Sequence, residues 1–459
     1  MDTKKLRQKI LDLAIHGKLV PQDPNDEPAS VLLERIRAEK EQLIKEGKIK
    51  APKKSKSAGD TSHYPKDVPF EVPEGWALST VIDVFQINPK NHEDDATEAG
   101  FVPMTNISDG FEDRFSFELK PWKSIKTGFT HFRNGDIAVA KISPCLENRK
   151  SFVVRGLPQE IGAGTTELFI FRSGQIIPEY GLLFFKSEFF ISNCVGTFNG
   201  VVGQQRVARN TIEEMPFPIP PIREQKRIIQ RVGSIFRMVS EVENSQTALK
   251  DSIEKSKARI LDMAIHGKLV PQDSSEEPAI ALLKRINPDF KASDNLHYEG
   301  ILPSGWTLCC LEDVLDYEQP QAYIVNSTDY SDDYKTPVLT PGKSFVLGYT
   351  NELSGIYNHL PVIIFDDFTT ESKYVDFPFK VKSSAMKILR ARGEINLKYV
   401  AIFMSITRLV GDTHKRYWIS EYSKIPIPIP PLREQGRIVL AAKHLLNQLD
   451  NLIACISDN

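Results

Sequence analysis

Apolar residues recur along the middle of the chain at alternating spacings of four and three residues. From Ile228 the pattern continues through Val232, Ile235, Val239, Val242, Leu249, Ile253, Ile260 and Met263, with polar interruptions at Gln246 and Ser256. A heptad pattern over about five repeats predicts one long helix that packs against a second helix. At about 1.5 Å per residue, a helix from Ile228 to Met263 would span roughly 50 Å, which suits a spacer. The alternative is that these residues form core stripes of two separate bundles.

The same pattern appears at both ends of the chain. The apolar positions are Ile438, Ala442, Leu445, Leu449, Leu452 and Ile456 near the C-terminus, and Leu6, Ile10 and Leu13 near the N-terminus. Together the two end segments would form a composite helix that packs antiparallel against the central helix. This arrangement predicts that the two termini lie close together.

Two segments between these helical parts combine strand-like runs with one helix each. The first, roughly 70–221, contains DIAVAKI at 136–142, ELFIF at 167–171 and an apolar helix candidate at 178–192. The second, roughly 301–431, contains PVIIF at 361–365 and a helix candidate at 396–410. We call them the first and second insert, and expect each to be a compact mixed α/β domain of about 130 to 150 residues. The fold class is therefore α+β.

Proline-rich tracts end both inserts. Pro216–Pro221 and Pro426–Pro431 cannot be helical or sit inside a sheet, because proline lacks an N–H group and restricts φ. The acidic residues in Arg223-Glu224-Gln225 and Arg433-Glu434-Gln435, which follow directly, favour the first turn of a helix.

Repeated segments define the organisation of the chain. ILDLAIHGKLVPQD at 10–23 returns as ILDMAIHGKLVPQD at 260–273, an offset of 250, and MPFPIPPIREQ at 215–225 returns as IPIPIPPLREQ at 425–435, an offset of 210. A weaker pair joins VPEGWALSTVIDV at 72–84 to LPSGWTLCCLEDV at 302–314. The two offsets show that the middle of the chain contains a copy of the C-terminal segment followed by a copy of the N-terminal segment. The chain is therefore a circular repeat with pseudo-twofold symmetry, and its two inserts do not match in sequence.

These boundaries divide the chain into six predicted segments. They are an N-terminal helical region at 1–45, a basic linker at 46–69, the first insert at 70–221, a central long-helix region at 222–292, the second insert at 301–431 and a C-terminal helix at 432–459.

Composition narrows the class of protein. The 459 residues exceed one typical domain, and the contents of 41% hydrophobic and 26% charged residues suit globular domains. No apolar run is long enough to span a membrane and no secretory signal begins the chain, so a cytoplasmic location is expected. Five cysteines without CxxC pairing argue against structural zinc. A formal charge of -2 excludes nucleic-acid coating by net charge alone.

The GKLVPQD turn, the PIPP-x-REQ exit, the duplicated helices and the two unlike inserts together resemble the specificity subunit of type I restriction-modification systems. The resemblance implies that each insert is a target-recognition domain that reads one half of a split site in double-stranded DNA. It also implies that the repeated helices bind two methyltransferase subunits, and that translocating restriction subunits join the complex. Identical scaffold halves should bind the same partner twice, and unlike inserts should read unlike sequences, so the target should be bipartite and asymmetric.

No Asn/Asp-Pro-Pro-Tyr/Phe segment of a methyl-transfer site occurs in the chain. A non-catalytic subunit without bound cofactor or metal is therefore expected, with S-adenosylmethionine on the partner methyltransferase.

Two clusters of the first insert are candidates for contacting DNA, because they combine cations for phosphates with amides and hydroxyls for base edges. They are Lys141, Ser143, Asn148, Arg149 and Lys150 in KISPCLENRKSF, and Gln204, Gln205 and Arg206 in GVVGQQRV. A solvated loop and a simple turn are the alternatives.

Three clusters of the second insert are candidates for the same role. They are Lys343 and Ser344 in TPGKSF, then Thr369, Thr370, Lys373 and Tyr374 in FDDFTTESKY, and Lys415, Arg416 and Tyr417 in HKRYW. TPGKSF is not a nucleotide-binding loop, because Pro337 stands where the first glycine of such a loop belongs. For HKRYW the alternative is a packed Trp418.

Two other functions fit parts of the chain. Asp366 or Asp367 with Glu371 and Lys373 resembles the acidic constellation of a metal-dependent nuclease, which would act within the second insert. A protein-binding assembly scaffold is the other alternative, and it would show no DNA sequence preference.

Overall fold

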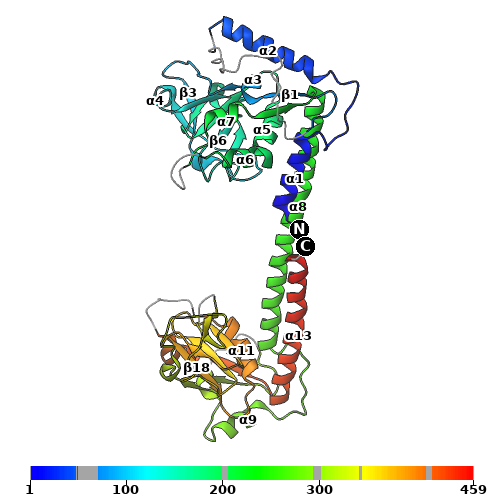
Figure 1. Cartoon of the computed structure of the whole chain (residues 1–459). Coiled ribbons are helices and arrows are strands. Elements are labelled where there is room, and N and C mark those ends of the chain that lie inside the picture. The colour runs from blue at the N-terminus through cyan, green and yellow to red at the C-terminus, as the bar shows by residue number, and fades with distance from the viewer. Residues whose placement is uncertain are drawn as a thin grey trace. The chain divides into compact units, whose positions relative to one another are not determined.

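The structure is a computed structural model that describes residues 2–47, 49, 71–198, 205–292, 301–340, 344–409 and 416–457. It consists of two compact units, Met1–Asn244 and Ser245–Asn459 (Figure 1). The predicted long helix exists as α8, Ile222–Ile265, which contributes its first part to the first unit and its remainder to the second. Its heptad pattern thus belongs to one helix, as the spacing indicates.

In the first unit, α1 (Thr3–Ile15) lies along α8, as Figure 1 shows. The pairing is antiparallel, because Arg7 forms an ion pair with Glu243 at 2.6 Å while Gln22, after the end of α1, donates to Glu224 near the start of α8. Ile10 belongs to the same buried cluster as Ile228 and Val232 of α8. The short connection then leads to α2, Ala29–Lys45.

In the second unit, α8 pairs with α13, Leu432–Ser457, in the same way. Lys257 contacts Asp450 at 2.7 Å and Gln272 donates to Glu434, so this pairing is also antiparallel. Lys257 corresponds to Arg7 by the offset of 250, and Asp450 to Ser240 by the offset of 210, and Arg7 also donates to Ser240 at 2.9 Å. The repeat therefore preserves a polar contact between the two helices although the residues differ. Helix α9, Ala279–Ile286, follows the turn.

The first insert consists of three small sheets. β1 (Ala77–Thr80) pairs with β10 (Pro216–Ile219). A four-stranded sheet has the order β2 (Gln86–Ile87), β9 (Leu168–Arg172), β6 (Ile137–Ala140), β7 (Ser151–Val153), and another has the order β4 (Glu118–Pro121), β3 (Glu98–Val102), β8 (Ile161–Gly164), β5 (Thr130–Arg133). The helices are α3 (Val81–Val84), α4 (Trp122–Ile125), α5 (Pro178–Lys186), α6 (Glu188–Val195) and α7 (Arg209–Glu213). The predicted strands in DIAVAKI and ELFIF are confirmed as β6 and β9.

The second insert repeats this plan with different residues. β11 (Thr307–Cys310) pairs with β19 (Pro426–Ile429). The larger sheet has the order β12 (Leu315–Glu318), β18 (Met386–Ala391), β15 (Val362–Asp366), β16 (Ser372–Val375), and the smaller has the order β14 (Val346–Thr350), β13 (Thr336–Leu339), β17 (Lys380–Val381). The helices are α10 (Leu311–Val314), α11 (Leu397–Ile406) and α12 (Tyr417–Ser420). The predicted strand in PVIIF is β15 and the predicted helix at 396–410 is α11.

The proline tracts do not sit inside a sheet, but they do form strands, β10 and β19. Each belongs to a ladder of two strands whose outer edge needs no N–H donor. One prediction about local structure is wrong, because the single helix expected at 178–192 is divided into α5 and α6. Ser187 ends the first helix and caps the second, and its Oγ accepts from the Phe190 N–H at 3.2 Å.

The turn after α1 requires glycine for two reasons. Gly17 has a φ of 65°, and a Cβ at this position would lie 2.2 Å from the Cγ of Pro73. Gly267 repeats both features in the second unit, with a φ of 64° and a Cβ position 2.4 Å from the Cγ of Pro303. The start of each insert therefore packs directly on the turn of the repeated scaffold.

We expect Gly17→Ala to lower the melting temperature of the chain more than Gly47→Ala, the matched control. Gly47 also has a positive φ, 69°, but a Cβ there meets nothing within 4 Å, so its replacement costs only backbone strain of about 1 kcal/mol. Gly17→Ala adds the clash with Pro73. Scanning calorimetry of both variants measures the difference, and equal melting temperatures would contradict this packing argument.

Candidate nucleic-acid interface

The two candidate clusters of the first insert lie together. The Ser143 N–H donates to the Gln205 carbonyl at 2.8 Å, the Val207 N–H donates to the Lys141 carbonyl at 3.0 Å, and Ile142 forms a β-bridge with Arg206. The loop between β6 and β7 and the segment before α7 are thus joined through their backbones. Residues about 60 positions apart in the sequence form one surface, as a shared role requires.

Side chains on this surface interact mainly with protein groups. Arg206 donates to both carboxylate oxygens of Glu167 at 2.8 Å, and these bonds lower the pKa of Glu167. Lys141 lies over the ring of Phe169 at 5.3 Å, and Ser143 donates to Glu147 at 2.7 Å. Such exposed pairs are weak, so Arg206 could exchange its carboxylate for a phosphate at small cost.

Arg149 holds the loop from inside. Its side chain is 5% exposed, its φ is 56°, and its Nε donates to the carbonyl of Lys186 at 3.0 Å. It also forms an ion pair with Glu188, which accepts a hydrogen bond from Gln8 of α1 at 2.9 Å. Arg149 therefore supports the loop from beneath the surface, where its charge is paired with Glu188, and its contact with DNA stays a prediction.

Lys186 is the second buried cation beneath this loop. Its Nζ donates to the carbonyls of Gly110 and Arg149, both at 2.8 Å, and burial lowers its pKa to about 7. Burial disfavours the charged form of a lysine. Lys186 nevertheless stabilises the fold here, because its Nζ joins the loop of Gly110 to the loop of Arg149.

Sequence reasoning missed a third loop, residues 104–114. Lys150 donates to the Ile107 carbonyl at 2.8 Å, and the Gly110 N–H donates to the Asn148 carbonyl at 2.7 Å, so this loop packs against the β6–β7 loop. The signal in the sequence was the Asp109-Gly110 turn, which its acidic surroundings obscured. Lys150, predicted to contact DNA, also serves as a link between loops.

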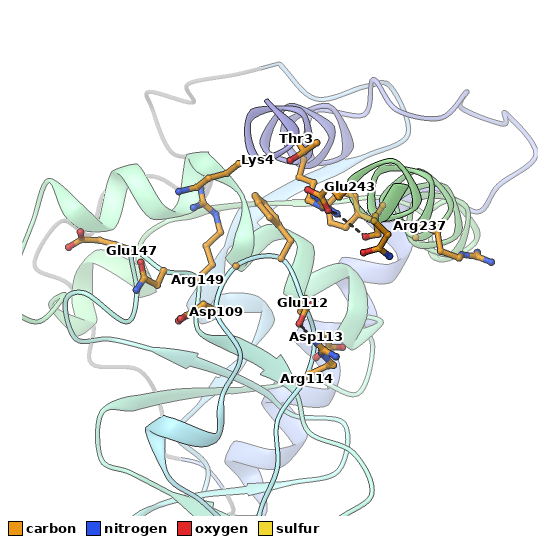
Figure 2. A pocket seen from close by; sticks show the side chains of 18 residues that line it. Thr3, Lys4, Asp109, Glu112, Asp113, Arg114, Glu147, Arg149, Arg237 and Glu243 are labelled. Atoms are coloured by element: carbon orange, nitrogen blue, oxygen red, sulfur yellow. Dashed lines mark hydrogen bonds and ion pairs between the residues drawn. The ribbon is translucent and has the colours of Figure 1, made fainter. Parts of the chain in front are cut away.

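These loops line an open pocket of ≈ 930 Å³ against the helices of the same unit (Figure 2). Thr3 and Lys4 come from α1, Arg237 and Glu243 from α8, and Phe111 from the missed loop contacts Phe236 of α8 edge to face at 5.8 Å. The pocket carries cations and carboxylates side by side, without the uniform positive charge of a phosphate channel.

Two candidate clusters of the second insert also lie together. The Tyr417 N–H donates to the Asp367 carbonyl at 2.9 Å, and the Trp418 N–H donates to its carboxylate at 2.8 Å. Asp367 is itself paired with buried Lys387 at 3.2 Å. FDDFTTESKY and the end of HKRYW thus pack together through buried residues, at the loop that follows β15.

Side chains of these two clusters divide into exposed and buried. Thr369 donates to Asp366 at 2.6 Å and is exposed, as is Lys373, whereas Tyr374 is half-buried with Lys398 over its ring at 5.1 Å. Thr370 and Tyr417 are buried and pack within the fold, and their contact with DNA stays a prediction. Trp418 is packed as well, as the alternative interpretation of HKRYW has it.

The carboxylates of the nuclease hypothesis serve separate structural contacts. Asp366 accepts from the N–H of Phe368 at 3.0 Å, Asp367 pairs with Lys387, and Glu371 pairs with Arg408 at 3.1 Å. Across the ranges that the structure describes, no three His, Cys, Asp or Glu side chains are grouped to hold a metal ion.

The candidate residues therefore fall into four groups. Gln204, Lys343 and Lys415 lie outside the described residues. Arg149, Thr370 and Tyr417 are buried. The exposed side chains are those of Asn148, Arg206, Ser344, Thr369, Lys373 and Arg416, while Lys141, Ser143, Lys150, Gln205 and Tyr374 are half-buried. DNA contact by the exposed and half-buried residues stays a prediction.

The duplicated scaffold with two inserts of one plan can be compared with known proteins. The family model of the type I restriction modification DNA specificity domain matches residues 73–253 and 303–457. The chain is 34% identical to the type I restriction enzyme EcoAI specificity subunit of Escherichia coli, over 96% of this chain and 85% of that protein. The chain is a type I restriction-modification specificity subunit.

Other relatives of this specificity subunit share parts of it. The EcoEI specificity subunit of Escherichia coli is 37% identical over 68% of this chain and 62% of its own length. The EcoR124I/EcoR124II specificity subunit of the same species is 52% identical, over 28% of this chain and 33% of its own length.

Solved structures agree on the fold of the specificity subunit. A chain from a structure of type I R-M complex assembly and conformational transition gives a TM-score of 0.63 at 18% identity, covering 85% of this chain and 95% of that one. The HsdS subunit from Thermoanaerobacter tengcongensis gives 0.52 at 17% identity, over 85% of this chain and 93% of that one. Among the described residues of the specificity subunit, no helix has the length and apolar character to cross a membrane.

We expect Lys186→Met to flatten the rise of stability with pH between about pH 7 and pH 10. The folded pKa of Lys186, about 7, lies below the unfolded value of about 10.4, so the unfolded chain binds the extra proton in this range and raising the pH stabilises the fold. The measurement is the melting temperature of wild type and variant across this range. Parallel pH curves would show that Lys186 is not a proton-linked group.

Proposed function

We propose that this specificity subunit reads a split, asymmetric target in double-stranded DNA, one half-site with each insert, and has no catalytic activity of its own. The observation that carries the proposal is the duplication: two inserts share one strand and helix plan on equivalent scaffold turns, while their sequences differ. Equivalent frames with unlike surfaces are what the reading of two unlike half-sites requires.

Each insert offers one composite surface for this contact. In the first insert, Asn148 and Arg206 are exposed on the joined loops, and in the second insert Thr369, Lys373 and Arg416 are exposed on the corresponding junction. Amide, guanidinium and hydroxyl groups read base edges in the major groove, and ammonium groups contact phosphates.

The scaffold helices present apolar side chains that the described chain does not cover. Met238 and Val242 of α8 are 50% and 41% exposed in the first unit, and Leu452 of α13 is 52% exposed in the second. Val242 and Leu452 are equivalent by the offset of 210. In the second unit, Leu452 lines a groove of ≈ 520 Å³ between α8 and α13 together with Leu449, Leu445 and Ile260. These two equivalent places support docking of two methyltransferase subunits, one on each unit.

Catalysis and cofactor belong to these partners in our proposal. Methyl transfer from S-adenosylmethionine would take place on the methyltransferase subunits, and translocating restriction subunits would join the same complex for cleavage. The named relatives are specificity subunits of restriction enzymes, which supports this division of labour. The complex would act in the cytoplasm, where its DNA substrate lies.

Methylated adenines mapped in DNA from cells that carry this chain and its methyltransferase partner should define one split motif. Its two halves should differ in sequence and be separated by a fixed number of unspecified bases, because unlike inserts read them. Cells that lack this chain are the control and should lose the motif. A palindromic motif, or methylation without any sequence preference, would sink the proposal and favour an assembly scaffold.

Val242→Asp and Leu452→Asp should each reduce the complex to one copy of the methyltransferase subunit. A carboxylate at the centre of an apolar docking surface must be desolvated without a partner, which weakens association strongly. Native mass spectrometry of the reconstituted complex counts the copies. Leu353→Asp is the matched control, because Leu353 is 93% exposed and belongs to the second insert between β14 and β15, not to a scaffold helix. Two retained copies in both helix variants would place the docking surface elsewhere.

A further inference from the structure

A buried glutamine joins the first insert to its scaffold helix. Gln225, in the first turn of α8, is 0% exposed. Its Oε1 accepts from the N–H of Ile177, the N-cap residue of α5, at 3.1 Å, and its Nε2 donates to the carbonyl of Pro220 at 3.0 Å. One amide therefore connects the start of α8, the proline tract that precedes it and the N-cap residue of an insert helix.

Gln435 makes the same contacts in the second unit. It is 0% exposed, its Oε1 accepts from the N–H of Asn396 at 2.9 Å, and its Nε2 donates to the carbonyl of Pro430 at 2.9 Å. Asn396 is the N-cap residue of α11. The sequence separation of the N–H···O pair is 48 residues in the first unit and 39 in the second, so the contact is kept although the inserts differ in length.

Neighbouring polar groups complete the joint. Tyr180 of α5 donates to the Pro218 carbonyl at 3.0 Å, and Tyr399 of α11 donates to the Pro428 carbonyl at 2.6 Å. Both tyrosines are fully buried. Each insert helix is thus fixed to the strand that leads into the scaffold helix by a second hydrogen bond of the same type.

We propose that Gln225 and Gln435 are positioning residues that fix the direction of each insert on its scaffold helix and so restrict the gap between the half-sites. The inference rests on the proposed function. Apolar packing at the joint is not directional, whereas two hydrogen bonds from one buried amide to two backbone groups define an orientation. Without the glutamine amide, the Ile177 N–H and the Pro220 carbonyl would lose their hydrogen-bond partner. Because unpaired buried polar groups are costly, the insert would then be stabilised by any other orientation that gives them new partners.

The test is Gln225→Met and Gln435→Met in the complete complex with its methyltransferase partner. Methionine keeps the length of the side chain and removes both hydrogen bonds. The substrates are DNA duplexes that carry both half-sites with the native gap, or with a gap one base pair longer or shorter. Wild type should methylate only the native gap efficiently, and each variant should methylate the altered gaps to within about tenfold of the native one.

Phe132→Leu is the control for loss of stability, because Phe132 lies in the core of the first insert, 0% exposed and away from the joint. It should lower methylation of all three duplexes in proportion. If the glutamine variants keep the wild-type gap preference, or if Phe132→Leu broadens it equally, the inference is overturned.

Gln225→Glu provides a second variant if Gln225→Met does not fold. It keeps an acceptor for the Ile177 N–H but places a carboxylate against the Pro220 carbonyl, so it removes the donated hydrogen bond, adds repulsion there and should also broaden the gap preference. A gap preference as sharp as that of wild type contradicts the inference. If wild type methylates no split target at all, the proposed function itself fails, and that result is distinct from either outcome.

Discussion

The structure depends on covering one apolar stripe of α8 twice, with two different segments of the chain. In the first unit Ile228 and Val232 are buried in the cluster that includes Ile10, and in the second unit Ala264 shares a buried cluster with Ile438. Burial of apolar area supplies the stabilisation but little orientation, since it is not directional. The orientation comes from polar contacts between helices at fixed heights, namely Arg7 with Glu243 and Lys257 with Asp450. The scaffold therefore separates the source of its stability from the source of its register.

The sequence allowed much of this fold to be predicted, because near-identical segments and a sustained heptad leave few alternatives. The continuous α8, the strands β6, β9 and β15 and helix α11 were all readable from periodicity. The proline strands β10 and β19 were not, because whether a strand lies at a free edge depends on pairing with residues far away in the sequence. The division of α5 from α6 had a signal, Ser187 followed by Glu188, but the apolar residues on both sides hid it.

The candidate interface was only partly predictable, since a basic, polar loop reads the same whether its cations face phosphate or protein carbonyls. Lys150 and Arg149 are adjacent in such a loop, yet one donates to Ile107 and the other is buried against Glu188. Glu188, the partner of Arg149, lies 39 residues further along the chain. It belongs to a helix whose apolar residues indicate packing and give no sign of this ion pair. Conversely, the loop that contains Gly110 carries Asp109, Glu112 and Asp113, and its sequence gives no sign of its contact with the β6–β7 loop. Pairing of the clusters could not be predicted from spacing, since the backbone bond from Ser143 to Gln205 joins segments that are far apart in the sequence.

Near-neutral charge follows from the way these cations are used. With 58 basic and 60 acidic residues, attraction of the isolated chain to DNA cannot come from net charge, and in the described inserts many of the cations already have carboxylate or carbonyl partners. These ion pairs differ in how readily the cation can exchange its protein partner for a phosphate. The exposed Arg206–Glu167 pair costs little to open, whereas Arg149 and Lys387 are buried and would leave an unpaired charge behind. A phosphate could therefore replace the carboxylate partner at an exposed pair such as Arg206–Glu167, whereas the buried pairs of Arg149 and Lys387 hold the protein's own loops together.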